Sequence, residues 1–174
     1  MSESLLGAMT LAIDLIDNQT EMSLDFDQIF VDAGTGMGAA ALIIALGFLG
    51  CQANVYVTLI AGSELEFQKT LSFLKKSFED QVNISFSLSP YKFLYPLTAR
   101  SFGSTNASVF QEIKFFAERE GIFLDPIYTA KVFPAVCTEL FSHRVRGKSV
   151  WVHSGGALSL SGFVRSEMKK SLLI

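Results

Sequence analysis

The chain has 174 residues, which is enough for a single domain over 1–174 with a buried core. Its net charge is −3 and 18% of its residues are charged, so nothing in the composition favours nucleic acid as a partner. The two cysteines imply no disulfide framework, no metal-ligand spacing is present, and no secretory signal is visible, so we expect a cytoplasmic protein.

The first half of the chain alternates helices with short apolar strands. Hydrophobic periodicity predicts a helix over Leu5–Asn18, a strand over Ile29–Val31, a helix over Ala39–Leu49 that ends at Gly50, and a strand over Val55–Ile60. The strand–helix–strand order is a βαβ unit, and its crossover implies parallel strands.

The stretch from Ala33 to Ser63 carries no charge and is long enough to cross a bilayer. Glycines open it, and Asp32 and Glu64 rather than basic residues flank it, which is not typical of a membrane span. A helix buried on a sheet and a following buried strand also read as apolar on all sides. We therefore expect no membrane partner.

The second half continues the alternation. The predicted elements are a helix over Ser63–Phe78, a strand over Ile84–Leu88, an irregular stretch over Pro90–Thr105, helices over Ala107–Glu120 and Ala130–Phe141, and a strand over Val150–Val152. Pro134 has to lie in the first turn of its helix or break it. The whole pattern predicts an α/β fold, a three-layer α/β/α arrangement with a mainly parallel sheet.

The loop Gly34-Thr35-Gly36-Met37-Gly38 is the first candidate site, because it joins a strand to a helix start. Free N–H groups and the helix dipole favour an anion there, and the Thr35 hydroxyl adds a donor. The loop lacks the lysine of a P-loop, and its third glycine comes too early for a dinucleotide site, so a single phosphate fits better. A tight turn needed only for packing is an equal alternative.

Two later segments carry further polar side chains. Tyr128 is an acid, base or stacking candidate, Thr129 is a hydrogen-bond donor, and Lys131 is a solvated charge. A single tyrosine is more often a half-buried structural residue. Ser154 stands at a strand end, where its hydroxyl can bond a ring nitrogen or a phosphate oxygen. His153 has no acidic partner close in sequence, which favours a structural role.

Four stretches of this chain resemble the 1-aminocyclopropane-1-carboxylate (ACC) deaminase / D-cysteine desulfhydrase family of pyridoxal-phosphate enzymes, in the tryptophan synthase β-like superfamily. They are Leu6–Met9, Val31–Gly38, Gly121–Lys131 with its sequence GIFLDPIYTAK, and Trp151–Gly156 with its sequence WVHSGG. The resemblance covers nearly the whole chain and implies a domain of pyridoxal-phosphate fold type II.

The resemblance also implies roles for individual residues. The loop Gly34, Thr35, Gly36, Met37 and Gly38 would cradle the phosphate of pyridoxal 5′-phosphate, and Tyr128 would lie near the substrate amino acid. Thr129 and Ser154 would lie at the cofactor, with the Ser154 hydroxyl bonding the pyridine nitrogen, and both are of the desulfhydrase type. A hydroxyl does not hold a protonated pyridinium as a carboxylate would, so the ring would be a weaker electron sink. A weaker sink suits β-elimination better than ring opening.

The chain departs from the family pattern at several points. Met37-Gly38 stands where the family has a glycine followed by a hydroxyl residue, and Ala130 replaces a glycine. The family's Schiff-base lysine lies in an N-terminal half that this chain does not match, and Lys131 belongs to another motif. A Schiff-base lysine holds the cofactor and moves the substrate proton, so we expect this chain alone to be inactive.

Three functional hypotheses follow, of which the weakest is an unrelated nucleotide-binding α/β domain, disfavoured by the early third glycine of the loop. In the first, this is the C-terminal part of a deaminase or desulfhydrase that eliminates from D-cysteine-like substrates and releases ammonia. Its partners would be a small amino-acid substrate and either further copies of the chain or a lysine-bearing N-terminal partner chain. The second hypothesis is a non-catalytic remnant that binds a phosphorylated ligand, or a partner subunit.

Overall fold

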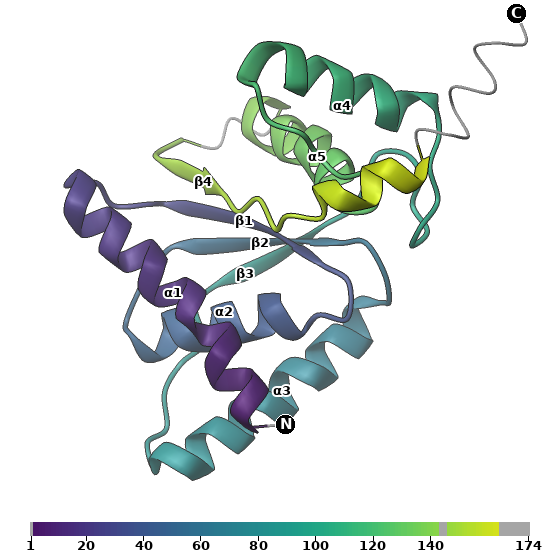
Figure 1. Cartoon of the computed structure of the whole chain (residues 1–174). Coiled ribbons are helices and arrows are strands. Elements are labelled where there is room, and N and C mark those ends of the chain that lie inside the picture. The colour runs from purple at the N-terminus through teal and green to yellow at the C-terminus, as the bar shows by residue number, and fades with distance from the viewer. Residues whose placement is uncertain (1, 143–145, 164–174) are drawn as a thin grey trace, which may run out of the picture.

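A computed structural model of the chain describes residues 2–142 and 146–163. The elements in chain order are α1 (Ser2–Met22), β1 (Gln28–Ala33), α2 (Met37–Phe48), β2 (Asn54–Leu59), α3 (Glu64–Val82), β3 (Tyr91–Leu94), α4 (Ala107–Glu120), α5 (Thr129–Ser142), β4 (Ser149–Trp151) and the 3-10 turn η1 (Ala157–Ser159). Helices α1, α2 and α3 cover one face of the sheet, and α4 and α5 cover the other (Figure 1). This arrangement confirms the predicted three-layer α/β/α fold.

The sheet has the strand order β3-β2-β1-β4, and every neighbouring pair is parallel. Ile29 on β1 is aligned with Val55 on β2, and Phe30 is aligned with Trp151 on β4. Parallel strands bring their carboxyl ends to one edge of the sheet. The loops that follow β1 and β4 therefore leave the sheet side by side.

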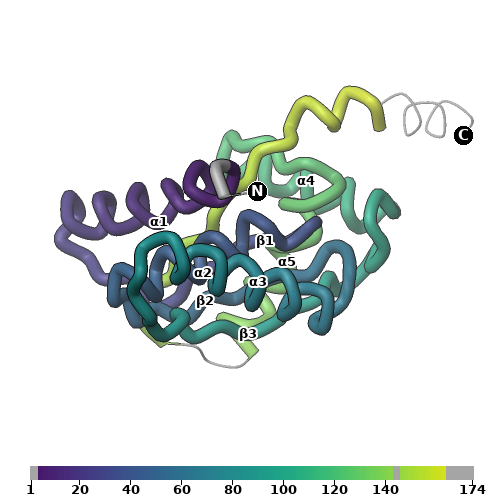
Figure 2. Tube along the Cα trace, turned by 90° about the horizontal axis from the view of Figure 1, so that it is seen from below, coloured from purple at the N-terminus to yellow at the C-terminus, as the bar shows by residue number. Residues whose placement is uncertain are grey.

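The pleat of β1 divides its side chains between two cores. Ile29 and Val31 pack with α1, α2 and α3 in the larger core, and Figure 2 looks onto this helical layer. Phe30 faces the other way, where it stacks on Tyr56 at a ring-centroid distance of 4.7 Å and packs with Val132 of α5. Side chains alternate along a strand, so Asp32 lies on the α5 side, like Phe30.

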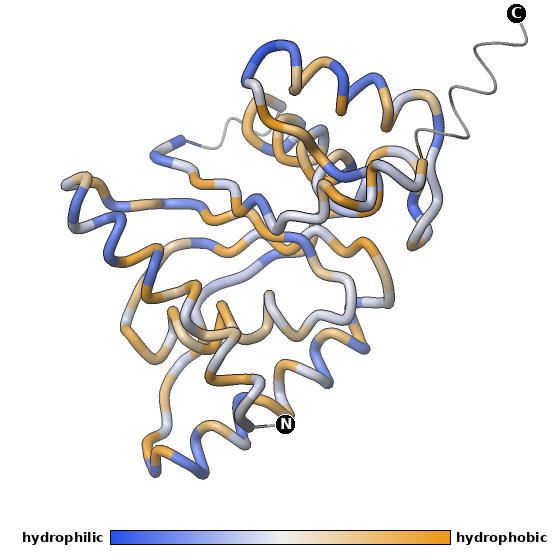
Figure 3. The backbone as a smooth tube through the Cα atoms, in the orientation of Figure 1, coloured by the Kyte–Doolittle hydropathy of each residue, from blue (hydrophilic) through white to orange (hydrophobic). Residues whose placement is uncertain are grey.

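Helix α2 is apolar on all sides because it lies between α1, α3 and the sheet. Every residue from Ala39 to Leu46 is buried, and the helix is mostly orange in the hydropathy view (Figure 3). The uncharged stretch from Ala33 to Ser63 is thus a buried helix followed by a buried strand, as the sequence favoured. Within the described ranges, no helix has both the length and the apolar character needed to cross a membrane.

The strand predicted over Ile84–Leu88 is wrong. This segment crosses beside α2 as an extended loop, and a Cβ on Gly47 would lie 2.4 Å from the backbone oxygen of Ser87. The third strand, β3, begins after Pro90, within the stretch expected to be irregular, and the Pro90 oxygen accepts a hydrogen bond from Val55 at 2.8 Å. Alternation in the loop arises because Phe86 and Leu88 pack on the core, not because they lie in a strand.

Pro134 neither breaks α5 nor lies in its first turn. The helix runs from Thr129 to Ser142 with Pro134 inside it. Val132 and Val136, on either side of the proline, are both buried in the core between α5 and the sheet. Packing of both halves against the sheet therefore holds the helix together where proline removes one backbone hydrogen bond.

Candidate functional site

A cavity of about 330 Å³ lies at the carboxyl ends of β1 and β4. Its walls are the loop after β1 from Gly34 to Gly38, the loop after β4 from Ser154 to Gly156, and Tyr128, which precedes α5. The N–H of Val152 bonds the oxygen of Phe30 at 2.9 Å, which extends the strand pairing up to the cavity. Three segments that the sequence analysis singled out separately thus form one site.

Gly36 shapes the first wall. It caps the N-terminus of α2 in a left-handed conformation with φ at 82°, and a Cβ there would lie 2.9 Å from the Phe67 ring. Both observations require glycine at this position. The first turn of α2 contains no acidic residue, and the first N–H groups of a helix have no partner within it. The wall therefore presents donors and a positive dipole to the cavity.

Other residues of this loop contribute in different ways. Thr35 and Gly38 are exposed and line the cavity. The Met37 side chain is half-buried and packs against the core formed with α1, α2 and α3. It is not among the lining residues, and the predicted role of Met37 at the cofactor phosphate stays a prediction.

Tyr128 forms the second wall and lies over the glycine loop. A Cβ on Gly34 would lie 3.0 Å from Tyr128 Oη, so the ring needs a glycine beneath it. Burial raises the pKa of Tyr128 above its ordinary value, and the nearby carboxyl groups of Asp32 and Asp125 act in the same direction. Tyr128 therefore keeps its phenolic proton at neutral pH and offers an O–H group to the cavity.

Asp125 fixes the position of Tyr128. This carboxylate is fully buried and accepts hydrogen bonds from the backbone N–H groups of Ile127 at 2.8 Å, Tyr128 at 2.8 Å and Thr129 at 2.9 Å. The arrangement caps the start of α5 in the manner of an N-cap aspartate. The turn that carries Tyr128 is therefore held by several hydrogen bonds from one side chain.

Thr129 is fully buried beneath this turn. Its hydroxyl donates to Asp125 Oδ2 at 2.7 Å and accepts from the Asp125 N–H at 2.7 Å. It is not among the residues that line the cavity. Its predicted role at the cofactor stays a prediction, and the contacts of its hydroxyl are those of the Asp125 turn.

The third wall is the glycine pair after β4. Gly155 and Gly156 have φ of 91° and 85°, and a Cβ on Gly156 would lie 3.0 Å from Asp125 Cγ. This close approach brings exposed Ser154 to the cavity. His153 shapes the same loop, because its Nδ1 accepts from the Gly155 N–H at 3.2 Å and its Nε2 lies 3.3 Å from the Phe123 oxygen.

Sequence reasoning missed Asp32. It lines the cavity, and its buried Oδ1 has no hydrogen-bond partner among the described residues. Burial raises the pKa of Asp32, hydrogen bonding by the Ser154 hydroxyl lowers it, and the charge of Asp125 raises it further. The sequence signal that could have identified Asp32 is its position two residues after Phe30. Alternation along the strand puts Asp32 on the α5 side of the sheet, and the carboxyl ends of parallel strands are where α/β proteins bind ligands.

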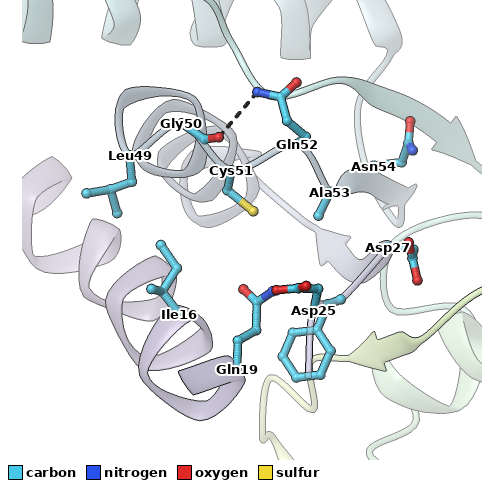
Figure 4. Close-up of a pocket in the computed structure, with 11 residues that line it drawn as sticks. Ile16, Gln19, Asp25, Asp27, Leu49, Gly50, Cys51, Gln52, Ala53 and Asn54 are labelled. Carbon is cyan, nitrogen blue, oxygen red and sulfur yellow. Dashed lines mark hydrogen bonds between the residues drawn. The ribbon is translucent and has the colours of Figure 1, made fainter. Parts of the chain in front are cut away.

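A second, larger cavity of about 480 Å³ lies at the opposite edge of the sheet, among the ends of α1 and α2 and the starts of β1 and β2 (Figure 4). Its lining holds Asp25 and Asp27 and no lysine or arginine. The Asp27 carboxylate already accepts the Lys148 N–H at 2.7 Å. This cavity also lies at the C-terminal end of α2, where the helix dipole disfavours an anion, whereas the glycine-lined cavity lies at the N-terminus of α2 and is the better candidate for a phosphate.

Comparison with curated proteins identifies distant relatives. D-cysteine desulfhydrase from Serratia proteamaculans (strain 568) is 21% identical over 160 residues, which are 91% of this chain and 48% of the relative. ACC deaminase from Cyberlindnera saturnus is 26% identical over 165 residues, 91% of this chain and 47% of the relative. The chain therefore spans about half the length of the curated relatives it matches. No protein-family model matches the chain.

Solved structures show the same relationship. The crystal structure of an ACC deaminase homologue matches with a TM-score of 0.76 and 25% identity, over 90% of this chain and 46% of that one. The crystal structure of a threonine deaminase from T.th. matches with a TM-score of 0.56 at 12% identity, over 87% of this chain and 57% of that one, which shows the shared fold alone. Together the comparisons confirm the fold and the resemblance to the ACC deaminase / D-cysteine desulfhydrase family.

Proposed function

We propose that this chain forms the phosphate-binding part of a pyridoxal-phosphate-dependent deaminase or desulfhydrase that acts on a small amino acid. The observation that carries the proposal is the single cavity where the glycine loop after β1, Tyr128 and Ser154 meet. The support from outside the chain is its resemblance to ACC deaminases and D-cysteine desulfhydrases, which form a pyridoxal-phosphate-dependent family.

The residues of the cavity fit this cofactor chemically. The start of α2 offers backbone N–H groups and a positive dipole to a phosphate, and Gly36 and Gly38 let the ligand approach closely. The Thr35 hydroxyl adds a donor. The orphaned oxygen of Asp32 and the hydroxyl of Ser154 supply polar partners for a heteroaromatic ring. We assign the phosphate to the glycine loop and the ring to the side of Ser154.

Within the described part of the chain, no lysine lines this cavity to supply the Schiff base that the chemistry needs. Lys131 lies three residues after Tyr128 but does not line the cavity. The sequence predicts a solvated charge there, yet Lys131 is only 2% exposed, and its Nζ donates to the Ser101 backbone oxygen at 3.0 Å. We propose that the cofactor-binding lysine comes from outside residues 1–174, either from the lysine-bearing half that the family has or from a partner chain.

Pyridoxal phosphate, when bound, supplies the electron sink that makes the substrate Cα–H acidic. The contribution of this chain is to bind the phosphate, to orient the ring and to place the protonated Tyr128 hydroxyl beside the substrate. By analogy with its relatives, the complete enzyme would eliminate from a D-cysteine-like substrate and release ammonia with sulfide. The hydroxyl residues Thr129 and Ser154 favour the desulfhydrase over the cyclopropane deaminase.

Apolar side chains near the cavity support a covering partner. The Phe102 ring packs edge-on against Tyr128 at a centroid distance of 5.9 Å while remaining 57% exposed, and Phe123 is 59% exposed. Large exposed apolar groups next to a polar site are typical of an interaction surface. We propose that the lysine-bearing part, or a second copy of the chain, covers this side of the cavity.

The alternative is a subunit that binds a phosphorylated ligand without catalysis. The absence of lysine from the lining, within the described residues, is the observation that favours it. Both functions require binding of a phosphorylated ligand at the glycine loop. They differ in whether a lysine-bearing partner restores turnover.

The first experiment is a visible absorption titration of the purified chain with pyridoxal 5′-phosphate, followed by borohydride reduction and mass mapping. We expect saturable binding without a covalent adduct at a single lysine, and much weaker binding of pyridoxal, which lacks the phosphate. A stable adduct trapped on one lysine would overturn the claim that this chain lacks the lysine. Failure to bind the cofactor at any accessible concentration would overturn the proposed function.

A charge variant tests the location of the phosphate. Gly38→Asp adds a negative charge in the first turn of α2, where a Cβ would meet no atom within 4 Å. An acidic residue at a helix start favours folding, so weaker binding would not reflect unfolding. We expect at least about tenfold weaker cofactor binding. The matched control is Gly7→Asp on α1, which is equally open and has the same charge change far from the cavity.

A further inference from the structure

Asp32 occupies a position at which a carboxylate is costly unless it has a partner. It is aligned with Thr58 across the parallel pair β1–β2, and both side chains lie on the α5 side of the sheet. The Asp32 Oδ1 and the Thr58 Oγ1 are both buried without hydrogen-bond partners in the described residues. Buried polar atoms are nearly always satisfied, so an orphaned acceptor on a cavity wall points to a missing ligand atom.

The residues that line the cavity indicate which part of a ligand would reach the Asp32 Oδ1. Asp32 shares the lining with Ser154 and Tyr128, and it stands two residues before the glycine loop that begins at Gly34. A ligand whose phosphate binds that loop and whose remaining atoms stay within the cavity would face these three side chains. Among them, Asp32 is the one that can carry a negative charge at neutral pH.

The groups around Asp32 set its protonation. Burial and the Asp125 charge raise the pKa of its carboxyl, whereas hydrogen bonding by Ser154 and the charge of His153 lower it. Tyr128, the other titratable side chain that lines the cavity among the described residues, is held in its neutral form because its own pKa is raised. The Asp32 carboxyl therefore retains a proton more readily than an exposed aspartate and can also release it to a basic partner.

We propose that the Asp32 carboxyl, together with the Ser154 hydroxyl, is the partner of the ring nitrogen of a pyridine-type phosphate ester in this cavity and keeps that nitrogen protonated. The proposal rests on the proposed function. Asp32 gives its proton to the ring nitrogen and becomes the carboxylate that faces the resulting pyridinium. Two opposite charges are then paired where either alone would be poorly solvated.

This assignment changes one expectation from the sequence. Ser154 alone predicts a hydroxyl contact to the ring nitrogen and a weak electron sink. A carboxylate beside that hydroxyl stabilises the pyridinium and strengthens the sink, as an aspartate partner does in other pyridoxal-phosphate sites. The preference for the desulfhydrase then rests on the residue types at Thr129 and Ser154 alone and not on a weak sink. Asp32 would thus be a positioning and proton-holding residue that the family motifs in this chain do not mark.

The test uses pyridoxine 5′-phosphate labelled with ¹⁵N in the ring, because this probe has no aldehyde and needs no lysine to bind. The ¹⁵N chemical shift reports protonation of the ring nitrogen, and a titration gives the dissociation constant. For the wild-type chain we expect the bound nitrogen to stay protonated to a higher pH than the free probe. Asp32→Asn should abolish this shift and weaken binding about tenfold.

Two further variants sharpen the result. Ser154→Ala should weaken binding while leaving the nitrogen protonated, because the carboxylate remains. Thr58→Val removes the neighbouring orphaned hydroxyl at the same register position with little change of shape, and should leave protonation unchanged. If Asp32→Asn does not fold, a wild-type profile in which the bound nitrogen titrates like the free probe still overturns the role of Asp32.

The outcomes separate this inference from the proposed function. A bound nitrogen that titrates like the free probe, or equal protonation in Asp32→Asn and wild type, would overturn the role of Asp32 while binding of the probe still supports the phosphate site. A wild-type chain that does not bind pyridoxine 5′-phosphate would overturn the proposed function, and the role of Asp32 with it.

Discussion

Tyr128 lies so close over Gly34 that a Cβ on the glycine would be 3.0 Å from the phenolic oxygen and 3.1 Å from Cε1. Gly34 does not have a positive φ, so the constraint is the ring above it and not the backbone conformation. The glycine loop and the tyrosine motif are far apart in sequence, and this contact makes them two sides of one cavity.

Gly34→Ala should therefore displace the Tyr128 ring. We expect pyridoxine 5′-phosphate to bind about tenfold more weakly and the free energy of unfolding to fall by about 1–3 kcal/mol, the usual cost of overpacking. A double-mutant cycle measured by chemical denaturation checks the cause. The cost of Gly34→Ala should shrink in a Tyr128→Ala background, because the clashing ring is gone. Equal costs in both backgrounds would show that the ring is not responsible.

Two helical glycines should respond oppositely to the same substitution. A Cβ on Gly47 in α2 would lie 2.4 Å from the Ser87 oxygen and 2.7 Å from the Ser89 nitrogen, whereas one on Gly7 in α1 meets nothing within 4 Å. Gly47→Ala should destabilise the fold by about 3 kcal/mol, since the clash is with backbone atoms. Gly7→Ala should stabilise it by about 0.5–1 kcal/mol through helix propensity.

Urea unfolding of these two variants beside the wild type measures both effects. Because the substitution is the same, differences in side-chain hydrophobicity do not contribute to the contrast. Gly47→Ala with wild-type stability would mean that the 84–88 loop can move away from α2. Such an outcome would contradict the tight packing of the 84–88 loop against α2.

The elements with strong local signals were predicted well. The predicted range Ala107–Glu120 coincides with α4, where Asn106 caps one end and Gly121 ends the helix at φ 70°. Prediction failed where tertiary contacts override the local pattern. The alternating Ile84–Leu88 is a loop because Phe86 and Leu88 pack on the core, and β3 forms beyond it through pairing with β2. Such long-range pairing leaves little signal in so short a strand.

The cap of α5 predicts a further stability difference. Asp125 accepts three backbone N–H groups and the Thr129 hydroxyl, whereas Asn106 at α4 accepts the single N–H of Val109 at 3.2 Å. Asp125→Ala should cost about 2–4 kcal/mol of unfolding free energy, because it leaves several buried donors without a partner. Asn106→Ala should cost about 1 kcal/mol, as expected for the loss of one cap.

Ligand binding distinguishes the two caps further. Asp125 holds the turn that carries Tyr128 and contacts Gly156, so Asp125→Ala should also weaken pyridoxine 5′-phosphate binding. Asn106→Ala should not, because it lies on the outer helix. Isothermal titration of both variants at a temperature where each is folded checks this. Equal affinity in the two variants would contradict a positioning role for Asp125.

The site itself was predictable only in part. Glycines, Tyr128 and Ser154 stand in motifs that a resemblance can identify, and the parallel sheet brings these motifs together at one edge. Asp32 stands in none of these motifs, and its alternation with Phe30 is a weak signal, because a carboxylate at a strand end is usually a solvated charge. Its burial and its unpaired oxygen depend on α5 packing over the sheet, which no local pattern encodes.

The raised pKa of Asp32 predicts how stability changes with pH. The folded state holds the Asp32 proton more tightly than the unfolded chain, whose reference pKa is 3.8. The contribution of this group to stability is therefore fully present below pH 3.8 and is lost as pH rises through the raised pKa of the folded state. Asp32→Asn does not titrate, so its stability relative to the wild type should increase across this window and then level off.

Chemical denaturation of both proteins over a pH series gives the difference in unfolding free energy, in which the titrating groups that are not coupled to Asp32 cancel. Thr58→Val is the matched control, since it alters the neighbouring position without adding or removing a titrating group, and its difference from wild type should be independent of pH. A difference for Asp32→Asn that falls as pH rises would mean that the folded state favours the carboxylate. That result would place a positive charge or additional donors beside Asp32, in conflict with its burial against Asp125.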